Sequence, residues 1–169
     1  MFVWRLARKR HLERALEGEG ARRFGGRWNS RRVAVVYSAE SLELALLEAL
    51  VHLDVDSLPK DYWQVCYEVD DALVGGPPKR LPRGWDALPP YQPRVQKIGD
   101  AWVKSSGSLA LRMPASVLPQ RCNVLINPAH PGLGSVREVE RARLACAALA
   151  LCACATAPPL TSPTVSISR

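Results

Sequence analysis

Residues 20–52, G-A-R-R-F-G-G-R-W-N-S-R-R-V-A-V-V-Y-S-A-E-S-L-E-L-A-L-L-E-A-L-V-H, carry the strongest structural pattern in this chain. They predict a glycine loop that bears arginines, a β-branched strand over residues 33–37, and a helix that begins after Ser38. Ser38 suits the helix N-cap, and Glu40 and Glu43 would lie in the first turn, where the helix dipole favours carboxylates. Apolar residues occupy nearly every side of this helix, so we expect it to be buried.

Glu48 and His52 interrupt the apolar surface of that helix. They are four residues apart and therefore share one flank. A buried carboxylate needs a partner or a cleft, because an isolated buried charge is strongly unfavourable. Two interpretations remain open from the residues alone. Glu48 is either satisfied by an arginine for structural reasons or faces a site.

The glycine loop suggests what such a site would bind. Gly25 and Gly26 allow the backbone to approach a ligand closely, and Trp28 and Asn29 can stack and form hydrogen bonds. Three arginines supply forked donors for phosphate or carboxylate: Arg22, Arg23 and Arg27. The loop therefore predicts an anion site, with a solvated basic turn as the alternative.

Several motifs in order along residues 4–140 resemble one known family. They are R-F-G-G-R-W-N, V-V-Y-S, L-L-E-A-L-V-H, G-D-A-W, S-L-A-L-R-M-P and N-V-L-I-N-P-A-H-P. Together they are similar to the RES domain, the toxin half of bacterial RES-Xre toxin–antitoxin pairs. The resemblance implies an α+β fold like that of ADP-ribosyltransferases, with small antiparallel or mixed sheets flanked by helices around an NAD cleft.

The resemblance also implies the site residues. The arginine, glutamate and serine that give the family its name map to Arg27, Glu48 and Ser108, and Tyr37 is a fourth catalytic position. Arg27 and Tyr37 would also bind NAD+, together with six further residues: Arg8, Trp28, Asn29, Ser38, His52 and Asn123. From its sequence context alone, Ser108 is a serine that caps a strand start.

The activity implied is cleavage of the nicotinamide–ribose bond of NAD+, which is a substrate here, and no metal is expected. Arg27 would hold the phosphates, Tyr37 would orient the nicotinamide, Glu48 would stabilise the ribose cation, and Ser108 would fix the ribose or amide. Water, phosphate or a protein side chain could accept the ribose. We expect NAD+ degradation first and protein ADP-ribosylation as the alternative. The expected partner is an Xre-type antitoxin in a hetero-oligomer.

The net charge of +7 is unevenly placed. Residues 1–32 hold ten Lys/Arg and three Asp/Glu, whereas the remainder holds thirteen of each. Excess positive charge near the glycine loop suits a dinucleotide, an acidic partner protein or nucleic acid. A nucleic-acid-binding or ribonuclease module would leave Glu48 unexplained, and no recognition helix or RNA-binding motif is visible. Nucleic acid is therefore expected only indirectly, through the antitoxin.

Length and cysteine usage favour one reduced cytoplasmic domain. The 169 residues, 47% of them hydrophobic, suit a single core. Neither a secretory signal nor a run of transmembrane length is visible, so no membrane association is expected. Five cysteines without a paired C-x-x-C pattern disfavour a disulfide framework or structural zinc.

The rest of the chain gives weaker predictions. Residues 75–93 hold six prolines and three glycines and predict an ordered surface loop, which Trp85 and Tyr91 would fasten. His130 is expected to be structural, in a turn over residues 127–131. We expect strands at residues 2–7, with Trp4 and Leu6 on one face, and at 62–69, 108–113 and 123–126, and helices at 8–20 and 95–104.

The C-terminal segment departs from the family pattern. We expect a domain over residues 1–143 and a divergent, partly disordered tail over 144–169, where an alanine-rich stretch favours helix and three prolines follow. The closing strand of the sheet is expected to be missing or replaced.

Overall fold

The structure is a computed structural model that describes residues 1–52 and 61–144. Its class is α+β, as expected. Within the described residues, seven strands form one curled sheet in the order β4-β5-β6-β2-β1-β3-β7. The strands are β1 (Phe2–Arg8), β2 (Val36–Ala39), β3 (Tyr62–Glu68), β4 (Val74–Gly75), β5 (Ala110–Pro114), β6 (Cys122–Ile126) and β7 (Arg137–Arg143). The helices are α1 (Glu19–Phe24), α2 (Leu42–His52) and α3 (Pro93–Ser105), with 3₁₀ turns at Lys9–Arg14, Asp71–Leu73 and Pro131–Ser135.

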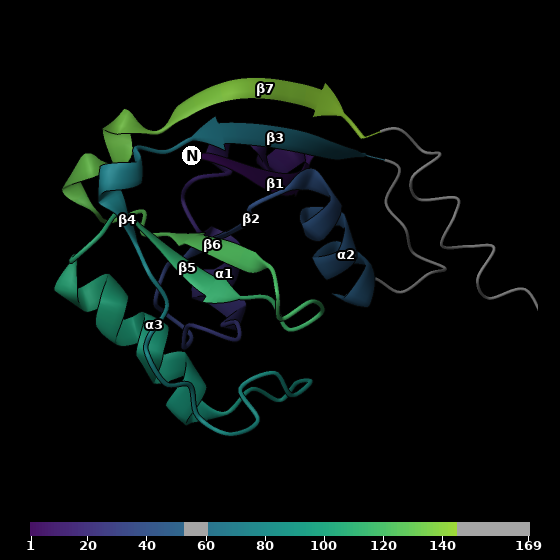
Figure 1. Cartoon of the computed structure of the whole chain (residues 1–169). Helices are drawn as coiled ribbons and strands as arrows, with labels where there is room; N and C mark the ends of the chain where they lie inside the picture. Colours follow the sequence, from purple (N-terminus) through teal and green to yellow (C-terminus); the bar gives the residue numbers. More distant parts are fainter. Residues whose placement is uncertain (53–60, 145–169) are drawn as a thin grey trace, which may run out of the picture.

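The sheet curls because its central strands separate. β1 pairs antiparallel with β3 along its whole length, from Phe2 opposite Glu68 to Arg8 opposite Tyr62. Its pairing with β2 consists of the single pair Trp4 and Ala39. Figure 1 shows β7, β3 and β1 together at the top and β6 and β5 across the middle, with α2 beside them. A gap in the ladder therefore divides the sheet between β1 and β2.

Alternation along the strands builds the core. Trp4 and Leu6 share one face of β1, as predicted, and pack against a small cluster beneath α2. The opposite face of β1 brings Val3 and Ala7 into the main core. Other members of this core come from four further strands and the segments beside them: Val36, Val65, Tyr67, Val69, Leu109, Ala110, Val124 and Ile126. One face of the curled sheet is thus continuously packed across the gap.

α3 confirms the helix predicted over residues 95–104. Pro93 occupies its first turn, where the missing N–H is harmless, and Ser106 ends it in the left-handed region with φ 49°. The helix packs closely on the glycine loop at Gly99. A Cβ built there would lie 1.8 Å from the carbonyl oxygen of Trp28. Glycine is therefore required at this crossing by the space available.

The strand and cap before α2 lie further along the chain than predicted. Strand β2 begins at Val36 rather than at Val33. Ser38 is inside that strand, where its hydroxyl donates to the carbonyl oxygen of Val124 at 2.6 Å. The N-cap is Ser41, whose hydroxyl accepts from the backbone N–H of Leu44. The prediction of Ser38 as N-cap was wrong because a serine suits both positions, and pairing with β6 places Ser38 in the sheet.

The helix predicted over residues 8–20 is instead two short elements. The 3₁₀ turn Lys9–Arg14 ends before Gly18, whose φ of 65° interrupts the helical path. α1 then runs from Glu19 to Phe24, so Arg22 and Arg23 are helical residues. The glycine loop itself is correspondingly shorter and begins at Gly25.

Helix α2 is less buried than its composition predicts. Leu44 and Ala45 pack against Ala39 and Ala115, whereas Leu47 and Val51 are 45% and 51% exposed. One layer of sheet can cover only one side of a helix. Apolar residues on the other side therefore remain at the surface.

β7 corrects the expectation that the closing strand is missing. It pairs antiparallel with β3 and forms one edge of the sheet. Its sequence R-E-V-E-R-A-R has no apolar face, which concealed it, because edge strands need little burial and charges protect them from further pairing. Arg137 pairs with Glu68, and Arg141 pairs with Glu13 and Glu138. The predicted tail lies, from residue 145, outside the described residues, and the boundary at 143 stays a prediction.

Within residues 1–52 and 61–144, the helices are too short or too polar to cross a membrane.

Candidate functional site

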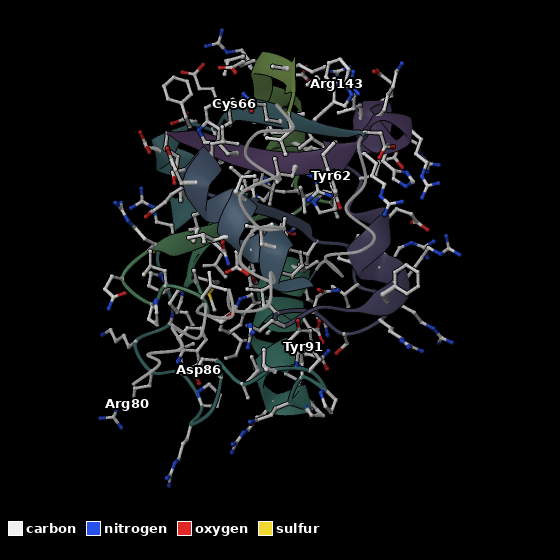
Figure 2. All side chains as sticks on the ribbon, turned by 90° about the vertical axis from the view of Figure 1, so that its right-hand side faces the viewer. Tyr62, Cys66, Arg80, Asp86, Tyr91 and Arg143 are labelled. Atoms are coloured by element: carbon white, nitrogen blue, oxygen red, sulfur yellow. The ribbon has the colours of Figure 1, made fainter. Side chains whose placement is uncertain are left out.

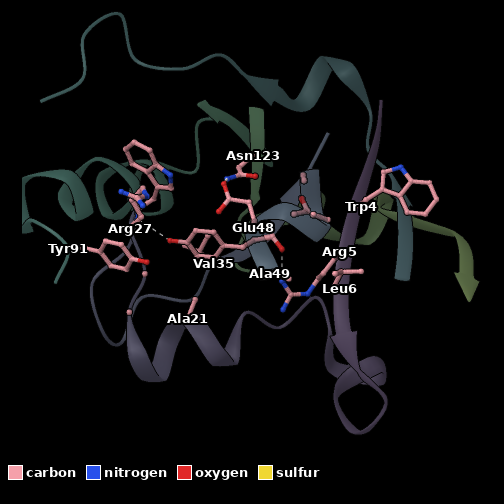
Figure 3. Close-up of a pocket in the computed structure, with 17 residues that line it drawn as sticks. Trp4, Arg5, Leu6, Ala21, Arg27, Val35, Glu48, Ala49, Tyr91 and Asn123 are labelled. Carbon is pink, nitrogen blue, oxygen red and sulfur yellow. Dashed lines mark hydrogen bonds between the residues drawn. The ribbon is translucent and has the colours of Figure 1, made fainter. Parts of the chain in front are cut away.

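A cavity of about 390 Å³ opens where β1 and β2 separate. Its lining comes from β1, the glycine loop, β2, the pocket side of α2, β6 and the end of the proline-rich segment. Figure 3 shows Glu48 and Asn123 meeting on one side of this pocket, Arg5 entering from β1, and Arg27 with Tyr91 at the far end. The gap between β1 and β2 therefore opens into a cleft that is lined by charged, amide and aromatic side chains.

Glu48 faces this pocket, as one of the two sequence interpretations required. Its Oε1 accepts a 2.6 Å hydrogen bond from Nδ2 of Asn123. Among the described residues no ion pair with an arginine holds it. The alternative of a purely structural Glu–Arg pair is therefore not what the structure shows.

Arg27 is deeply placed and largely engaged by the protein. It is 9% exposed. Its Nη1 donates to the carbonyl oxygens of Trp85 and Ala87, at 2.7 and 2.8 Å, and its Nη2 donates to the hydroxyl of Ser116 at 2.9 Å. The guanidinium also lies over the ring of Tyr91, 5.0 Å from the centroid. Arg27 thus fastens one wall of the cleft.

The proline-rich segment, residues 75–93, contributes Tyr91 to that wall. Trp85 stacks on Trp28 with ring centroids 5.7 Å apart, and Tyr91 lines the pocket. The prediction that Trp85 and Tyr91 fasten this loop is confirmed. Figure 2 shows Arg80 of the same segment reaching outward, away from the body of the protein, and Asp86 is also exposed. The segment is therefore ordered on its inner side and charged on its outer side.

Arg5 is a pocket residue that the sequence reasoning missed. Its Nη1 donates to the carbonyl oxygen of Tyr37 at 2.5 Å and so bridges β1 and β2 beyond their single residue pair. Its Nε is buried without a hydrogen-bond partner, and no ion pair among the described residues involves it. Burial lowers the pKa of Arg5 from its usual value, but a guanidinium remains charged at neutral pH. The signal available was its place at an inward position of β1.

Tyr37 joins the glycine loop to β2. Its hydroxyl donates to Oδ1 of Asn29 at 2.8 Å and accepts from the backbone N–H of Trp28 at 3.0 Å. Desolvation raises the pKa of Tyr37 well above its ordinary value, while the hydrogen bond from Trp28 lowers it. The phenol is therefore neutral, and its ring is the part that faces the cleft.

Some of the other residues predicted to bind NAD+ line the pocket and others do not. Trp28, Ser38 and Asn123 line the pocket, although the Ser38 hydroxyl is already used within the sheet. Asn29 is fully buried and supports the loop, its Nδ2 donating to the carbonyl oxygens of Ala21, Ser30 and Val33. Arg8 lies at the end of β1 and is not part of the lining. The side chain of His52 lies outside the described part of the chain.

Ser108 is not brought to this pocket. Its hydroxyl accepts from Nε1 of Trp102 at 2.9 Å and lies 2.8 Å from the Cβ that a residue at position 75 would carry. Ser116, in the turn between β5 and β6, does not line the pocket either, but its hydroxyl accepts a hydrogen bond from Arg27, which does. Ser108 opens the strand predicted over residues 108–113 and Ser116 follows it, and the sequence carried no signal that Ser116 would meet Arg27. His130 caps a turn, because its Nδ1 accepts from the N–H of Gly132.

No cluster of three or more His, Cys, Asp or Glu suited to a metal occurs in the described ranges. The cleft instead offers a carboxylate, a guanidinium without a carboxylate partner among those residues, and aromatic rings. Such a set can hold an anionic ligand and stabilise positive charge that develops on it.

Comparison with known proteins agrees with this architecture. The family model described as RES domain matches residues 2–147. The "Prs ADP-ribosylating toxin" of Sphingobium sp. (strain YBL2) is 39% identical over 140 residues, covering 79% of this chain and 86% of that protein. A "Toxin Res" of Yersinia enterocolitica is 34% identical over 131 residues, covering 77% and 86%.

A solved structure shares the fold. The crystal structure of the M. tuberculosis MbcT–MbcA toxin–antitoxin complex contains a chain that superposes with a TM-score of 0.70 at 21% identity, covering 90% of this chain and 86% of that one. The family match spans both halves of the sheet and every residue that lines the cleft. From its sequence match and its fold, this chain belongs to the RES-domain family, together with the Res toxins that it resembles.

Proposed function

We propose that this protein is the toxin of a toxin–antitoxin pair and that it cleaves the nicotinamide–ribose bond of NAD+. The observation that carries the proposal is that one cavity of about 390 Å³ is lined both by the carboxylate of Glu48 and by the guanidinium of Arg5, which has no carboxylate partner among the described residues. A carboxylate and a cation that line one cleft suit a ligand that has anionic phosphates and a ribose centre that becomes cationic.

The cleavage step balances without a further cofactor. The bond between C1′ of the ribose and N1 of nicotinamide breaks, and nicotinamide leaves with the electron pair. The Glu48 carboxylate stabilises the oxocarbenium-like centre, as carboxylates do in other glycosidic cleavages. An acceptor oxygen then bonds to C1′ and loses its proton to solvent. Water and phosphate are the acceptors that give NAD+ degradation.

The geometry favours Arg5 as the main phosphate contact. Three N–H groups of Arg27 already bind Trp85, Ala87 and Ser116, whereas Arg5 makes one hydrogen bond among the described residues. Nη2 of Arg5 makes no hydrogen bond among the described residues and is not one of the buried unpaired atoms, so it is the group that a bound phosphate can engage. In this proposal Arg27 shapes the wall, and Tyr37 and Tyr91 provide ring faces for the nicotinamide end.

Transfer of ADP-ribose to a protein side chain is the second candidate. The observation that favours it is the name of the Sphingobium relative, an ADP-ribosylating toxin, at 39% identity. The bond that breaks is the same in both reactions, and only the acceptor differs. Labelled NAD+ therefore separates them, because transfer places the label on protein and hydrolysis leaves it in free ADP-ribose.

The decisive experiment follows nicotinamide release from NAD+ by the wild type and by Glu48→Gln. The glutamine oxygen can still accept from Asn123, so the fold is retained while the charge is lost. We expect nicotinamide release by the wild type and none by the variant. A folded Glu48→Gln protein with wild-type turnover would sink the proposal.

The partner we propose is a cytoplasmic Xre-type antitoxin that blocks the cleft. Residues 1–32 include the glycine loop and carry the whole net charge of +7. This positive charge would attract an acidic inhibitory segment of the antitoxin. Co-expression should yield a complex and relieve toxicity, with affinity that falls as salt rises. Failure of both would count against this partner.

A further inference from the structure

Asn123 connects the rigid centre of the sheet to the pocket side of α2. It lies in β6 between two neighbouring strands, opposite Ala39 of β2 and Met113 of β5. Its Nδ2 donates to Oε1 of Glu48 at 2.6 Å, and both side chains line the pocket. Figure 3 shows the two side chains directed at one another. A hydrogen bond this short to a carboxylate is of the charge-assisted kind.

The second oxygen of Glu48 has no partner among the described residues. We propose that Asn123 is a positioning residue. It holds Glu48 through Oε1 so that Oε2 is presented to the ribose of the substrate, and Asn123 itself makes no contact that substrate affinity needs. This inference rests on the proposed function. It replaces the assignment of Asn123 as a residue that binds NAD+.

The chemistry of an amide suits this task. An arginine would engage a carboxylate with two parallel hydrogen bonds and offset its charge, leaving neither oxygen available. The neutral amide of Asn123 orients one oxygen and leaves the negative charge on the carboxylate. The developing cation of the ribose then meets the full charge of Glu48.

The architecture also requires such a contact. Glu48 has several side-chain torsions and projects from a helix whose outer residues Leu47 and Val51 are exposed. β6 has a strand on each side, so its backbone is fixed more firmly than α2. A catalytic group is positioned best when a side chain on a rigid element restrains it.

The first test separates turnover from binding in Asn123→Ala. We expect kcat for nicotinamide release to fall about 10- to 100-fold, the effect of misplacing a reacting group. The Kd for NAD+, measured by calorimetry in the inactive Glu48→Gln background, should not change on adding Asn123→Ala. A wild-type kcat would overturn the inference, and so would a weakened Kd, because a weakened Kd makes Asn123 a substrate contact.

The second test is a double-mutant cycle. If Asn123 acts only through Glu48, then Asn123→Ala should have little further effect on the turnover of Glu48→Asp, whose shorter side chain keeps a carboxylate but withdraws it from Nδ2 of Asn123. Losses that multiply would overturn the inference. The matched control is Gln64→Ala, which removes an exposed amide–carboxylate hydrogen bond of 3.0 Å to Glu140 outside the pocket. This control should keep the wild-type kcat.

The third test uses pH. Asn123→Asp places a carboxylate against Glu48, and two adjoining carboxylates hold a shared proton to a higher pH than either would alone. Turnover of Asn123→Asp should therefore fall as the pH rises through a step that the wild type lacks, because the shared proton takes the place of the Asn123 N–H and its loss leaves two carboxylates that repel each other. A profile parallel to that of the wild type would overturn the inference. A wild type that neither binds NAD+ nor releases nicotinamide overturns the proposed function itself, which is a distinct result.

Discussion

The guanidinium of Arg27 donates a 2.9 Å hydrogen bond to the hydroxyl of Ser116, which joins the glycine loop to the turn between β5 and β6. The same guanidinium holds the backbone of the proline-rich segment at Trp85 and Ala87. Three segments far apart in the sequence therefore meet at one cation. This junction therefore holds one wall of the cleft in place.

We predict that Ser116→Ala lowers kcat/KM for NAD+ by about tenfold or more, the equivalent of about 1.4 kcal/mol. The reason is that Arg27 loses one of the bonds that hold the cleft wall. Ser108→Ala is the matched control, because Ser108 binds Trp102 outside the pocket. Steady-state kinetics of nicotinamide release would measure both. The reverse result, with Ser108→Ala the impaired variant, would restore Ser108 as the site serine.

Arg5→Ala should weaken NAD+ binding by roughly 1.5 to 3 kcal/mol, the range for a hydrogen bond to a charged group. Calorimetry in the Glu48→Gln background measures this without turnover. Arg27→Ala should instead lower thermal stability more than Arg5→Ala does, since it leaves two carbonyls and a hydroxyl without their donor. Wild-type affinity in Arg5→Ala would return the phosphate contact to Arg27.

Tyr37 predicts a dependence of stability on alkaline pH. Its pKa is raised in the folded protein, chiefly by desolvation, so the folded state holds the phenolic proton more tightly than the unfolded state does. The stability that this adds is present below the unfolded pKa of about 10 and is lost as the pH rises above it. Tyr37→Phe should therefore lose less stability than the wild type between about pH 10 and 11. Equal losses in thermal melts would contradict this.

Gly99→Ala should destabilise the protein, by roughly 1 to 3 kcal/mol or more, as overpacking does. A Cβ there would lie 1.8 Å from the Trp28 carbonyl oxygen, so α3 must move from the glycine loop. Gly20→Ala is the control: it lies in α1 with nothing within 4 Å of its Cβ, and should be neutral or slightly stabilising. Chemical denaturation compares the two. A Gly99→Ala protein as stable as the wild type would show that α3 and the loop can separate freely.

Periodicity in the sequence predicted the elements that bury one face and repeat apolar residues along it. β3 and α3 repeat apolar residues at the spacing of their own structure, and both were predicted within a few residues of their bounds. β7 could not be found this way, since its charged side chains pair with neighbours rather than enter a core. Ser38 and Ser41 could not be ranked as caps, because the choice depends on where β6 pairs.

The sequence predicted the parts of the site that depend on local spacing, but not the contacts between distant segments. The spacing on α2 showed that Glu48 needed a partner, and the loop composition indicated a binding surface beside it. Which groups would meet there depends on contacts between distant segments, such as Arg27 with Ser116 and Glu48 with Asn123, 89 and 75 residues apart. Arg5 was overlooked because an arginine within a strand does not by itself indicate a binding site. Its role depends on the gap between β1 and β2, which the sequence did not predict.

The guanidinium of Arg5 also bears on the thermal stability of the protein. Arg5 alternates with Val3 and Ala7 on the side of β1 that faces the main core, at a position where a β-strand ordinarily carries an apolar residue. Arg5 is partly buried and its Nε has no partner, and replacing such a poorly paired charge by an apolar side chain of similar volume is often neutral or stabilising. Arg5→Met should therefore melt at a temperature no lower than the wild type while losing its affinity for NAD+. Such a result would mean that the residue proposed to bind the phosphates lowers the stability of the fold in which it lies.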